Sequence, residues 1–143
     1  MTNTSSHQMI TIDNQHYNAA DFNENAQAQL GNLRFTDEQL QTLQNQQALA
    51  ETAKAAYTRV LADHLPDKKA PANKKKGAIT IDGSKYNIDD FSDQGKAQLG
   101  NIQYAEQELI RLKNLQAVLQ TARTQYGQAL SKEIAKLTPV KPQ

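Results

Sequence analysis

The chain has 143 residues, of which 38% are hydrophobic and 22% charged, and its formal net charge is +1. This balance gives no global field that would indicate a nucleic-acid binder, and the absence of cysteine excludes a disulfide framework and a thiolate metal site. No apolar run approaches the roughly 18 residues of a transmembrane helix, and the polar residues 1–9 lack the features of a secretory signal. We therefore expect a cytoplasmic protein without a membrane-spanning segment.

An internal repeat organises the sequence. Residues 10–65 and 79–134 align without a gap at an offset of 69 residues, with 22 identical positions. A single module of this size buries only about 60% of its unfolded surface, so its core is marginal unless modules or chains pack together. We predict five segments: a disordered start at 1–9, a first module at 10–65, a linker at 66–78, a second module at 79–137 and a disordered tail at 138–143.

Each module is predicted to begin with a β-hairpin. In the second copy, Asp82-Gly83 lies between two stretches of alternating apolar and polar residues, and a two-residue type I′ turn needs residues that tolerate positive φ. Asn14 replaces the glycine in the first copy, and asparagine tolerates this conformation next best. The expected consequences are the pairs Ile79–Tyr86 and Ile81–Ser84, a buried face with Ile81 and Tyr86, and exposed Thr80 and Lys85.

A short helix should follow each hairpin. Asn23 and Ser92 are predicted N-caps because an acidic residue follows each of them in the first helical turn. We expect these helices to stop at Gly31-Asn32 and Gly100-Asn101, since glycine then asparagine is a plausible helix end. In the first copy the capping box Thr36-x-x-Gln39 favours a second helix start; the second copy keeps only half of this box, which leaves a continuous helix open there.

The last element of each module is a long amphipathic helix, expected at about 37–65 and 106–137. Its apolar residues recur at spacings of three and four and make one narrow stripe. A helix of about 29 residues is about 43 Å long, which a small hairpin cannot cover, so the stripe needs the sister helix or another chain. We expect these side chains at the helix–helix interface: Leu109, Leu112, Leu119, Tyr126 and Leu130.

The linker at 66–78 constrains how the long helices face each other. Five lysines, two prolines and one glycine predict a solvated spacer; contact with nucleic acid or an acidic membrane is the alternative, although no aromatic residue is interleaved with the lysines. About 13 flexible residues span roughly 20 Å, which suits antiparallel helices better than parallel ones. The predicted fold is therefore α+β and helix-dominated, with two tandem modules whose long helices form an antiparallel, coiled-coil-like pair.

The sequence offers no catalytic or metal site. It has no glycine-rich phosphate loop and no Ser-His-Asp arrangement, and the acidic cluster at 89–93 is better explained as helix N-terminal charge. A duplicated metal site would need ligands in both copies, but the sister positions of His16 and His64 hold lysine and glutamate, and His7 precedes the repeat. We expect a non-enzymatic protein that needs no metal and no cofactor.

Repeated polar residues near the stripe are the candidate ligand-binding residues. They are Gln47, Lys54 and Tyr57 in the first copy and Gln116, Arg123 and Tyr126 in the second. One interpretation is structural, because half-buried polar residues fix the register of paired helices and the cations extend along the stripe. The other is a site at a symmetric helix interface, because a cation, a tyrosine hydroxyl and amides on neighbouring turns suit a small anionic, nucleotide-like molecule.

Residues 81–130 contain Ile-Asp-Gly-x-x-Tyr, Asp-Phe-Ser, Lys-Ala-Gln-Leu-Gly-Asn-Ile-Gln and Thr-Ala-Arg-x-x-Tyr-x-x-x-Leu. This string resembles a small family of uncharacterised bacterial and phage proteins, a domain of unknown function that looks like a single copy of the module. The first copy departs from the pattern at Asn14 and Lys54. The resemblance implies no site residues; it implies that single-copy members self-associate.

Two hypotheses for function follow. The leading one is a non-enzymatic helical module that pairs with itself, as a homo-oligomer, or with another protein. The alternative is an oligomeric protein that sequesters a small anionic, nucleotide-like ligand, of the kind that phages use against nucleotide second messengers. Nucleic acid and membrane are not expected as partners, and the biological process is not indicated by any motif.

Overall fold

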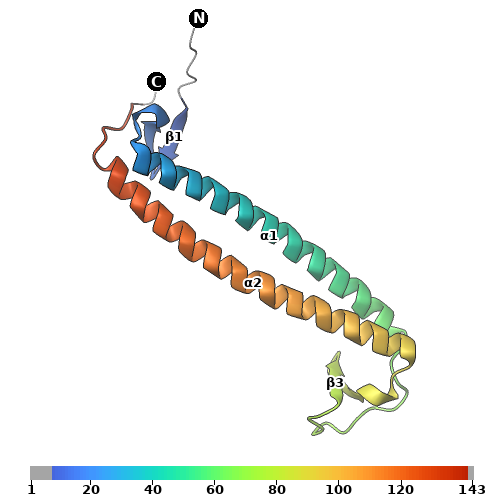
Figure 1. The fold of residues 1–143 in the computed structure, drawn as a ribbon. Coiled ribbons are helices and arrows are strands. Elements are labelled where there is room, and N and C mark those ends of the chain that lie inside the picture. Colours follow the sequence, from blue (N-terminus) through green and yellow to red (C-terminus); the bar gives the residue numbers. More distant parts are fainter. Residues whose placement is uncertain (1–7, 142–143) are drawn as a thin grey trace, which may run out of the picture. The chain divides into compact units, whose positions relative to one another are not determined.

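In the computed structural model, which describes residues 8–141, the fold is α+β and dominated by two long helices (Figure 1). Strands β1 (Met9–Ile12) and β2 (Gln15–Asn18) form the first hairpin, and β3 (Ala78–Ile81) and β4 (Ser84–Asn87) form the second. Each hairpin continues through a short 3-10 helix, η1 (Ala19–Asp21) or η2 (Ile88–Asp90), into a long helix, α1 (Glu24–Ala62) or α2 (Asp93–Ile134). Residues 1–7, with His7, and 142–143, all in the predicted disordered ends, lie outside the described residues. Within 8–141, no helix combines the length and the apolar character needed to cross a membrane.

The predicted hairpin register is confirmed. Ile79 pairs with Tyr86 and Ile81 with Ser84, and the first hairpin has the equivalent pairs. Asp82 and Gly83 have φ values of 48° and 80°, as a type I′ turn requires. Tyr86 is buried as expected, but Ile81 is only half-buried because it lies beside the turn at the end of the hairpin.

Both predicted N-caps are confirmed. The Asn23 side-chain oxygen accepts a hydrogen bond from the Ala26 amide at 2.8 Å, and the Ser92 hydroxyl accepts one from the Gly95 amide at 3.1 Å. The Asn23 side-chain nitrogen also donates to Glu133 at 2.9 Å, and this hydrogen bond lowers the pKa of the Glu133 carboxyl. Asn23 therefore caps the start of α1 and also joins this helix to the end of α2.

The predicted helix break at Gly31 is wrong, because α1 runs through this glycine. At Gly100 the break is also absent, and the alternative of a continuous helix in the second copy is confirmed. A single glycine costs a helix about 1 kcal/mol relative to alanine, and the packing of Leu30 and Leu33 on either side of Gly31 against the core offsets this cost. The Thr36 hydroxyl, expected in a capping box, instead donates to the carbonyl four residues earlier at 2.7 Å. The long helices therefore begin at Glu24 and Asp93, not near 37 and 106.

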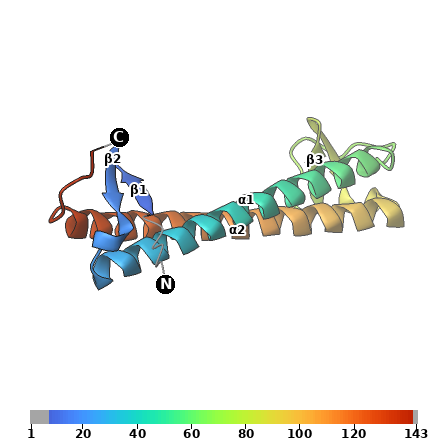
Figure 2. The same cartoon turned by 90° about the horizontal axis from the view of Figure 1, so that it is seen from above.

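The chain forms two compact units. Unit 1 combines Met1–Thr42 with Leu115–Gln143, and unit 2 is Leu43–Asn114. Each unit contains one hairpin, the beginning of the helix that follows it and the end of the other long helix. In both ribbon views the blue beginning of α1 lies beside the red end of α2 (Figures 1 and 2), which is the helix packing within unit 1.

Each unit has its own small core, built from equivalent repeat positions. In unit 1, Tyr17 and Phe22 cluster with Leu130 and Ile134 of α2; in unit 2, Tyr86 and Phe91 cluster with Leu61 of α1. Tyr17 and Tyr86, Phe22 and Phe91, and Leu61 and Leu130 are sister pairs in the repeat. Of the stripe expected at a helix–helix interface, Leu109, Leu112 and Leu130 are buried, and Leu119 and Tyr126 are half-buried.

The helical segments are antiparallel within each unit. In unit 1, Asn23 binds Glu133 and Asp37 binds Arg123, so the residue number falls along α2 as it rises along α1. In unit 2, Lys54 binds Glu106, and just beyond the end of α1 the carbonyl of His64 lies against Gly95, where an added Cβ would meet it at 3.3 Å. The two long helices thus pack against each other in the predicted direction within each unit.

The segment that follows each long helix pairs with a hairpin, which the sequence did not predict. In unit 1 the Val140 amide donates to the His16 carbonyl at 2.7 Å, and in unit 2 the Ala70 amide donates to the equivalent Lys85 carbonyl at 2.8 Å. The Lys85 ammonium also donates to the Lys74 carbonyl at 2.8 Å, so this residue is half-buried and not exposed as expected. The expectations of a purely solvated linker and a tail without structure are wrong at these positions.

We expect Leu130→Ala to loosen the first hairpin before the second. Leu130 is 2% exposed and belongs to the core of unit 1, and truncation of a buried leucine costs about 2–5 kcal/mol. Amide hydrogen exchange should accelerate first in β1 and β2. The sister change Leu61→Ala, at a residue 1% exposed in unit 2, should act first on β3 and β4; if each change instead loosened the hairpin of its own repeat, the arrangement would be contradicted.

Candidate interaction surface

The repeated cations of the predicted ligand site are both bound by carboxylates. Lys54 Nζ lies 3.3 Å from Glu106 Oε1 in unit 2, and Arg123 Nε lies 2.6 Å from Asp37 Oδ1 in unit 1. Asp37 and Glu106 are sister residues, so the two ion pairs are equivalent. The hydrogen bond with Asp37 raises the pKa of Arg123. In both units a cation of one repeat therefore meets the acid of the other.

The remaining predicted ligand residues are half-buried within their own units. Tyr57 packs against the core of unit 2, and Tyr126 is half-buried in unit 1. Gln47 in unit 2 and Gln116 in unit 1 are half-buried and each engages in an interaction. The structure thus brings one set of cation, tyrosine and glutamine into each unit, as the repeat requires.

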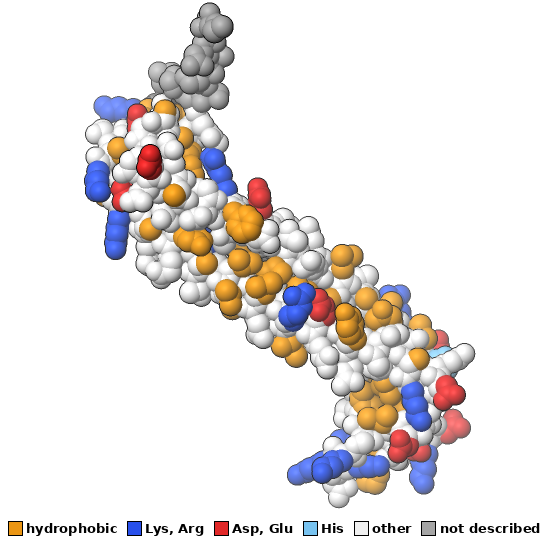
Figure 3. Space-filling model, in the orientation of Figure 1, with side chains coloured by type: hydrophobic (Ala, Val, Ile, Leu, Met, Phe, Trp, Pro, Cys, Tyr) orange, Lys and Arg blue, Asp and Glu red, His pale blue; other side chains and the backbone are white. Residues whose placement is uncertain are grey.

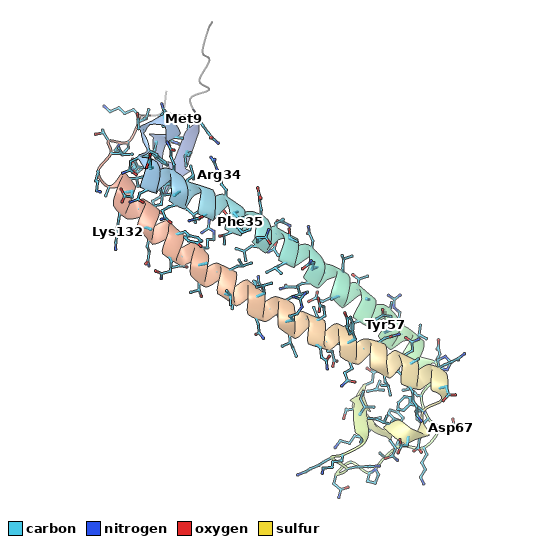
Figure 4. The ribbon with its side chains drawn as sticks, in the orientation of Figure 1. Met9, Arg34, Phe35, Tyr57, Asp67 and Lys132 are labelled. Carbon is cyan, nitrogen blue, oxygen red and sulfur yellow. The ribbon has the colours of Figure 1, made fainter. Side chains whose placement is uncertain are left out.

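Two repeat positions keep an apolar side chain although it is exposed. Phe35 and Tyr104 are 61% and 71% exposed, and Leu49 and Val118 are 72% and 63% exposed. Phe35 and Val118 belong to unit 1, and Tyr104 and Leu49 belong to unit 2, so each unit presents one aromatic and one aliphatic residue. Figure 3 shows hydrophobic side chains at the surface over the helices, and Figure 4 labels Phe35 on α1.

Other exposed apolar residues of the helices lack this duplication. Ile110 and Leu115 are 61% and 40% exposed, and each has a glutamine at its sister position. These positions show that an exposed residue of the repeat is free to become polar. The aromatic pair and the aliphatic pair changed their residue type between the repeats but stayed apolar, although all four side chains are exposed.

A repeated glycine lies one turn before each exposed aromatic residue. Gly31 precedes Phe35 by four residues and Gly100 precedes Tyr104 by four, so each pair shares a helix face. Neither glycine has a positive φ, and a Cβ added to either would meet no atom within 4 Å. Both repeats therefore keep a glycine that weakens the helix, although a Cβ would fit at either position within the residues that the structure describes.

We call these residues the glycine–aromatic surfaces, one in each unit: Gly31, Phe35 and Val118 in unit 1, and Gly100, Tyr104 and Leu49 in unit 2. In unit 2, Leu49 and Tyr104 border an apolar groove with a volume of about 310 Å³. Ala50, Ala53 and Tyr57 also line this groove. The sequence analysis did not identify these surfaces because it considered only the apolar stripe. The signal that could have identified them is that both repeats keep apolar residues at these positions outside the stripe.

The histidines do not form a metal centre with acidic residues. Among residues 8–141, no three potential metal-ligating side chains lie together. The Thr11 hydroxyl and His16 Nδ1 are hydrogen-bonded at 2.9 Å, which gives His16 a local role in the first hairpin.

No protein-family model, no curated protein sequence and no solved structure matches the chain. The resemblance to the bacterial and phage domain of unknown function therefore stays a prediction. Function must be inferred from the geometry of the units and from the comparison of the two repeats.

We expect a double-mutant cycle of Asp37→Ala and Arg123→Ala to show a coupling of about 0.2–1 kcal/mol in the free energy of unfolding. Their side chains are 51% and 52% exposed, so solvent screens the ion pair and salt should reduce the coupling. Urea denaturation of the four variants measures it. Combining Arg123→Ala with Glu106→Ala is the control, because these residues are not paired, and equal coupling in both cycles would contradict the pairing.

Proposed function

We propose that the chain is a non-enzymatic self-association module whose glycine–aromatic surfaces pack against a second copy of the chain. The observation that carries this proposal is the repeated combination of three features. A helical glycine has no steric role within its unit, an exposed aromatic residue follows one turn later, and an exposed aliphatic residue lies on the other helix of the unit.

A second copy is the partner that fits this repetition. A two-fold interface uses the same patch on both partners, and this chain carries the same set of residues twice. Glycine lets a neighbouring helix approach closely, and side chains of packed helices fill the gaps between residues of the facing helix. The four exposed side chains are uncharged, so the surfaces favour apolar packing over recognition of a charged partner.

The exposed apolar area is adequate for such an interface. A fully buried aromatic side chain removes about 150–250 Å² from water. With the four side chains 61–72% exposed, the surfaces of the two units add up to roughly 400–600 Å² per chain, or about 1,000 Å² for two chains. This total is near the lower limit of specific interfaces, a size typical of weak or transient association.

The ion pairs favour this role over sequestration of a nucleotide-like ligand at the repeated cations. Lys54 and Arg123 already bind carboxylates, so an anion would have to displace Glu106 or Asp37. Tyr57 also packs against the core of unit 2. A role in fixing the helix register accounts for these contacts without a ligand.

We expect Gly31→Ala with Gly100→Ala to stabilise the fold and weaken self-association. Each added methyl meets no atom of the chain and should raise the free energy of unfolding by about 0.5–1 kcal/mol. The same methyl occupies the space that the partner's backbone would approach. Urea denaturation of the monomer should therefore show a higher free energy of unfolding. Sedimentation equilibrium should show weaker self-association.

The matched control for the glycines is Gly127→Ala. Gly127 is also helical and its added Cβ meets no atom within 4 Å, but its sister residue is Thr58, so glycine is not repeated there. This change should stabilise the fold and leave association unchanged. If all three glycine changes affected association equally, or not at all, the glycines would have no interface role.

We expect Leu49→Lys with Val118→Lys to make the chain monomeric at concentrations where the unchanged chain associates. Both residues are more than three-fifths exposed, so the fold should tolerate lysine, whereas an interface would bury two unpaired charges. The control is Val60→Lys with Ile110→Lys, which adds the same charge at exposed apolar positions outside the surfaces. A wild-type chain that sediments as a monomer even at about 100 µM, a concentration at which weak interfaces of this size class associate, would sink the proposal.

A further inference from the structure

A groove in unit 1 combines an aliphatic floor with a cationic rim. Its volume is about 720 Å³, within the range of small-molecule sites. The floor is formed by β1 and the two helical segments of the unit, through Ile10, Ile12, Leu30, Leu33 and Leu130. The first four of these side chains are half-buried, so they present apolar surface to the groove.

Three cations line the groove, and two of them have no anionic partner. Arg123 binds Asp37, which also lines the groove. Arg34 on α1 and Lys132 on α2 (labelled in Figure 4) make no ion pair within residues 8–141. Asp13 in the hairpin turn is the other lining carboxylate, so the groove keeps an excess of positive charge. The Ser131 hydroxyl also lines the groove.

The second repeat does not reproduce this chemistry. The sister positions of Arg34 and Lys132 hold Gln103 and Asp63, and that of Gly127, another lining residue, holds Thr58. Core and ion-pair positions are equivalent in both units, so these differences mark a property of unit 1 alone. They also make unit 2 a control within the same molecule.

We propose that this groove binds a small amphiphilic anion, an alkyl chain with one carboxylate head, such as a medium-chain fatty acid. The alkyl chain lies on the Ile and Leu floor, and the head binds one of the two lining cations that form no ion pair within residues 8–141, Arg34 or Lys132. The lining residues include no aromatic side chain, so a nucleobase would have nothing to stack on. The inference is independent of self-association, because none of the six residues of the glycine–aromatic surfaces lines the groove.

Decanoate titrated into the full chain tests the proposal by amide NMR. We expect saturable shifts in β1 and around residues 30–37 and 123–132, without equivalent shifts in β3. Decyltrimethylammonium has the same chain with a positive head and should not bind, and adenosine monophosphate should bind at least tenfold more weakly. Binding of the ammonium compound as tight as that of decanoate would show apolar adsorption only, and preferred binding of the nucleotide would show phosphate recognition; either result overturns the proposal.

Charge variants distinguish binding in the groove from a general attraction of the anion to the cations of the chain. Arg34→Gln with Lys132→Gln should weaken decanoate binding at least tenfold, and Gly127→Thr should weaken it by narrowing the groove. Arg59→Gln with Lys113→Gln removes the same charge in unit 2 and should change the affinity less than twofold. Equal losses in the two double variants, or an unchanged affinity in the first, would overturn the assignment of the head group to Arg34 or Lys132.

Discussion

The apolar stripe of each long helix is the constraint on which the rest of the structure depends. Helices of 39 and 42 residues are about 60 Å long, whereas a hairpin with four-residue strands covers only the beginning of its own helix. The end of each helix must therefore be buried elsewhere. In each unit it packs against the hairpin of the other repeat, as Leu130 does beside Tyr17 and Leu61 does beside Tyr86.

This exchange of helix ends explains several features that look unrelated in the sequence. The linker and the tail each follow a helix end, so they arrive beside the hairpin that this end covers, where Ala70 and Val140 pair with equivalent strand residues. The ion pairs of Lys54 and Arg123 link one repeat to the other for the same reason. Exposed ion pairs contribute about 0–1 kcal/mol and a buried leucine about 2–5 kcal/mol. Packing therefore holds the helices together, and the charges help to select their register.

Because the helices are continuous, the duplicated glycines need an explanation other than a helix end. A glycine that ended a helix would be explained by its backbone conformation, but Gly31 and Gly100 are helical and their missing side chains leave open space. A cost of about 1 kcal/mol at each site without an internal benefit is the physical basis on which we propose a partner at these surfaces. The exposed Phe35 and Tyr104 one turn later strengthen that interpretation.

Much of the local structure could be predicted from the sequence, because short-range chemistry determined it. The positive φ at Asp82 and Gly83 set the hairpin register, and Asn23 and Ser92 capped the helices. The helix break at Gly31 was predicted wrongly because a Gly-Asn pair is a local signal, whereas the packing of Leu30 and Leu33 on both sides of it is tertiary. Val140 and Ala70 each pair with a hairpin through backbone atoms alone, so no side-chain pattern could predict these pairings. The groove beside Arg34 and Lys132 depends on residues from three elements and could not be assembled from spacing.

The direction of the helices within one chain can be measured directly, since the chain has no cysteine of its own. Spin labels on cysteines introduced at Asn32 and Gln128, both exposed and both in unit 1, should be separated by less than about 25 Å, because packed helix axes lie about 8–10 Å apart. Dilution with unlabelled chain restricts the measurement to distances within one molecule. Parallel helices would place these residues about 27 positions out of step, near 40 Å apart, and a distance of that size would contradict the exchange of helix ends.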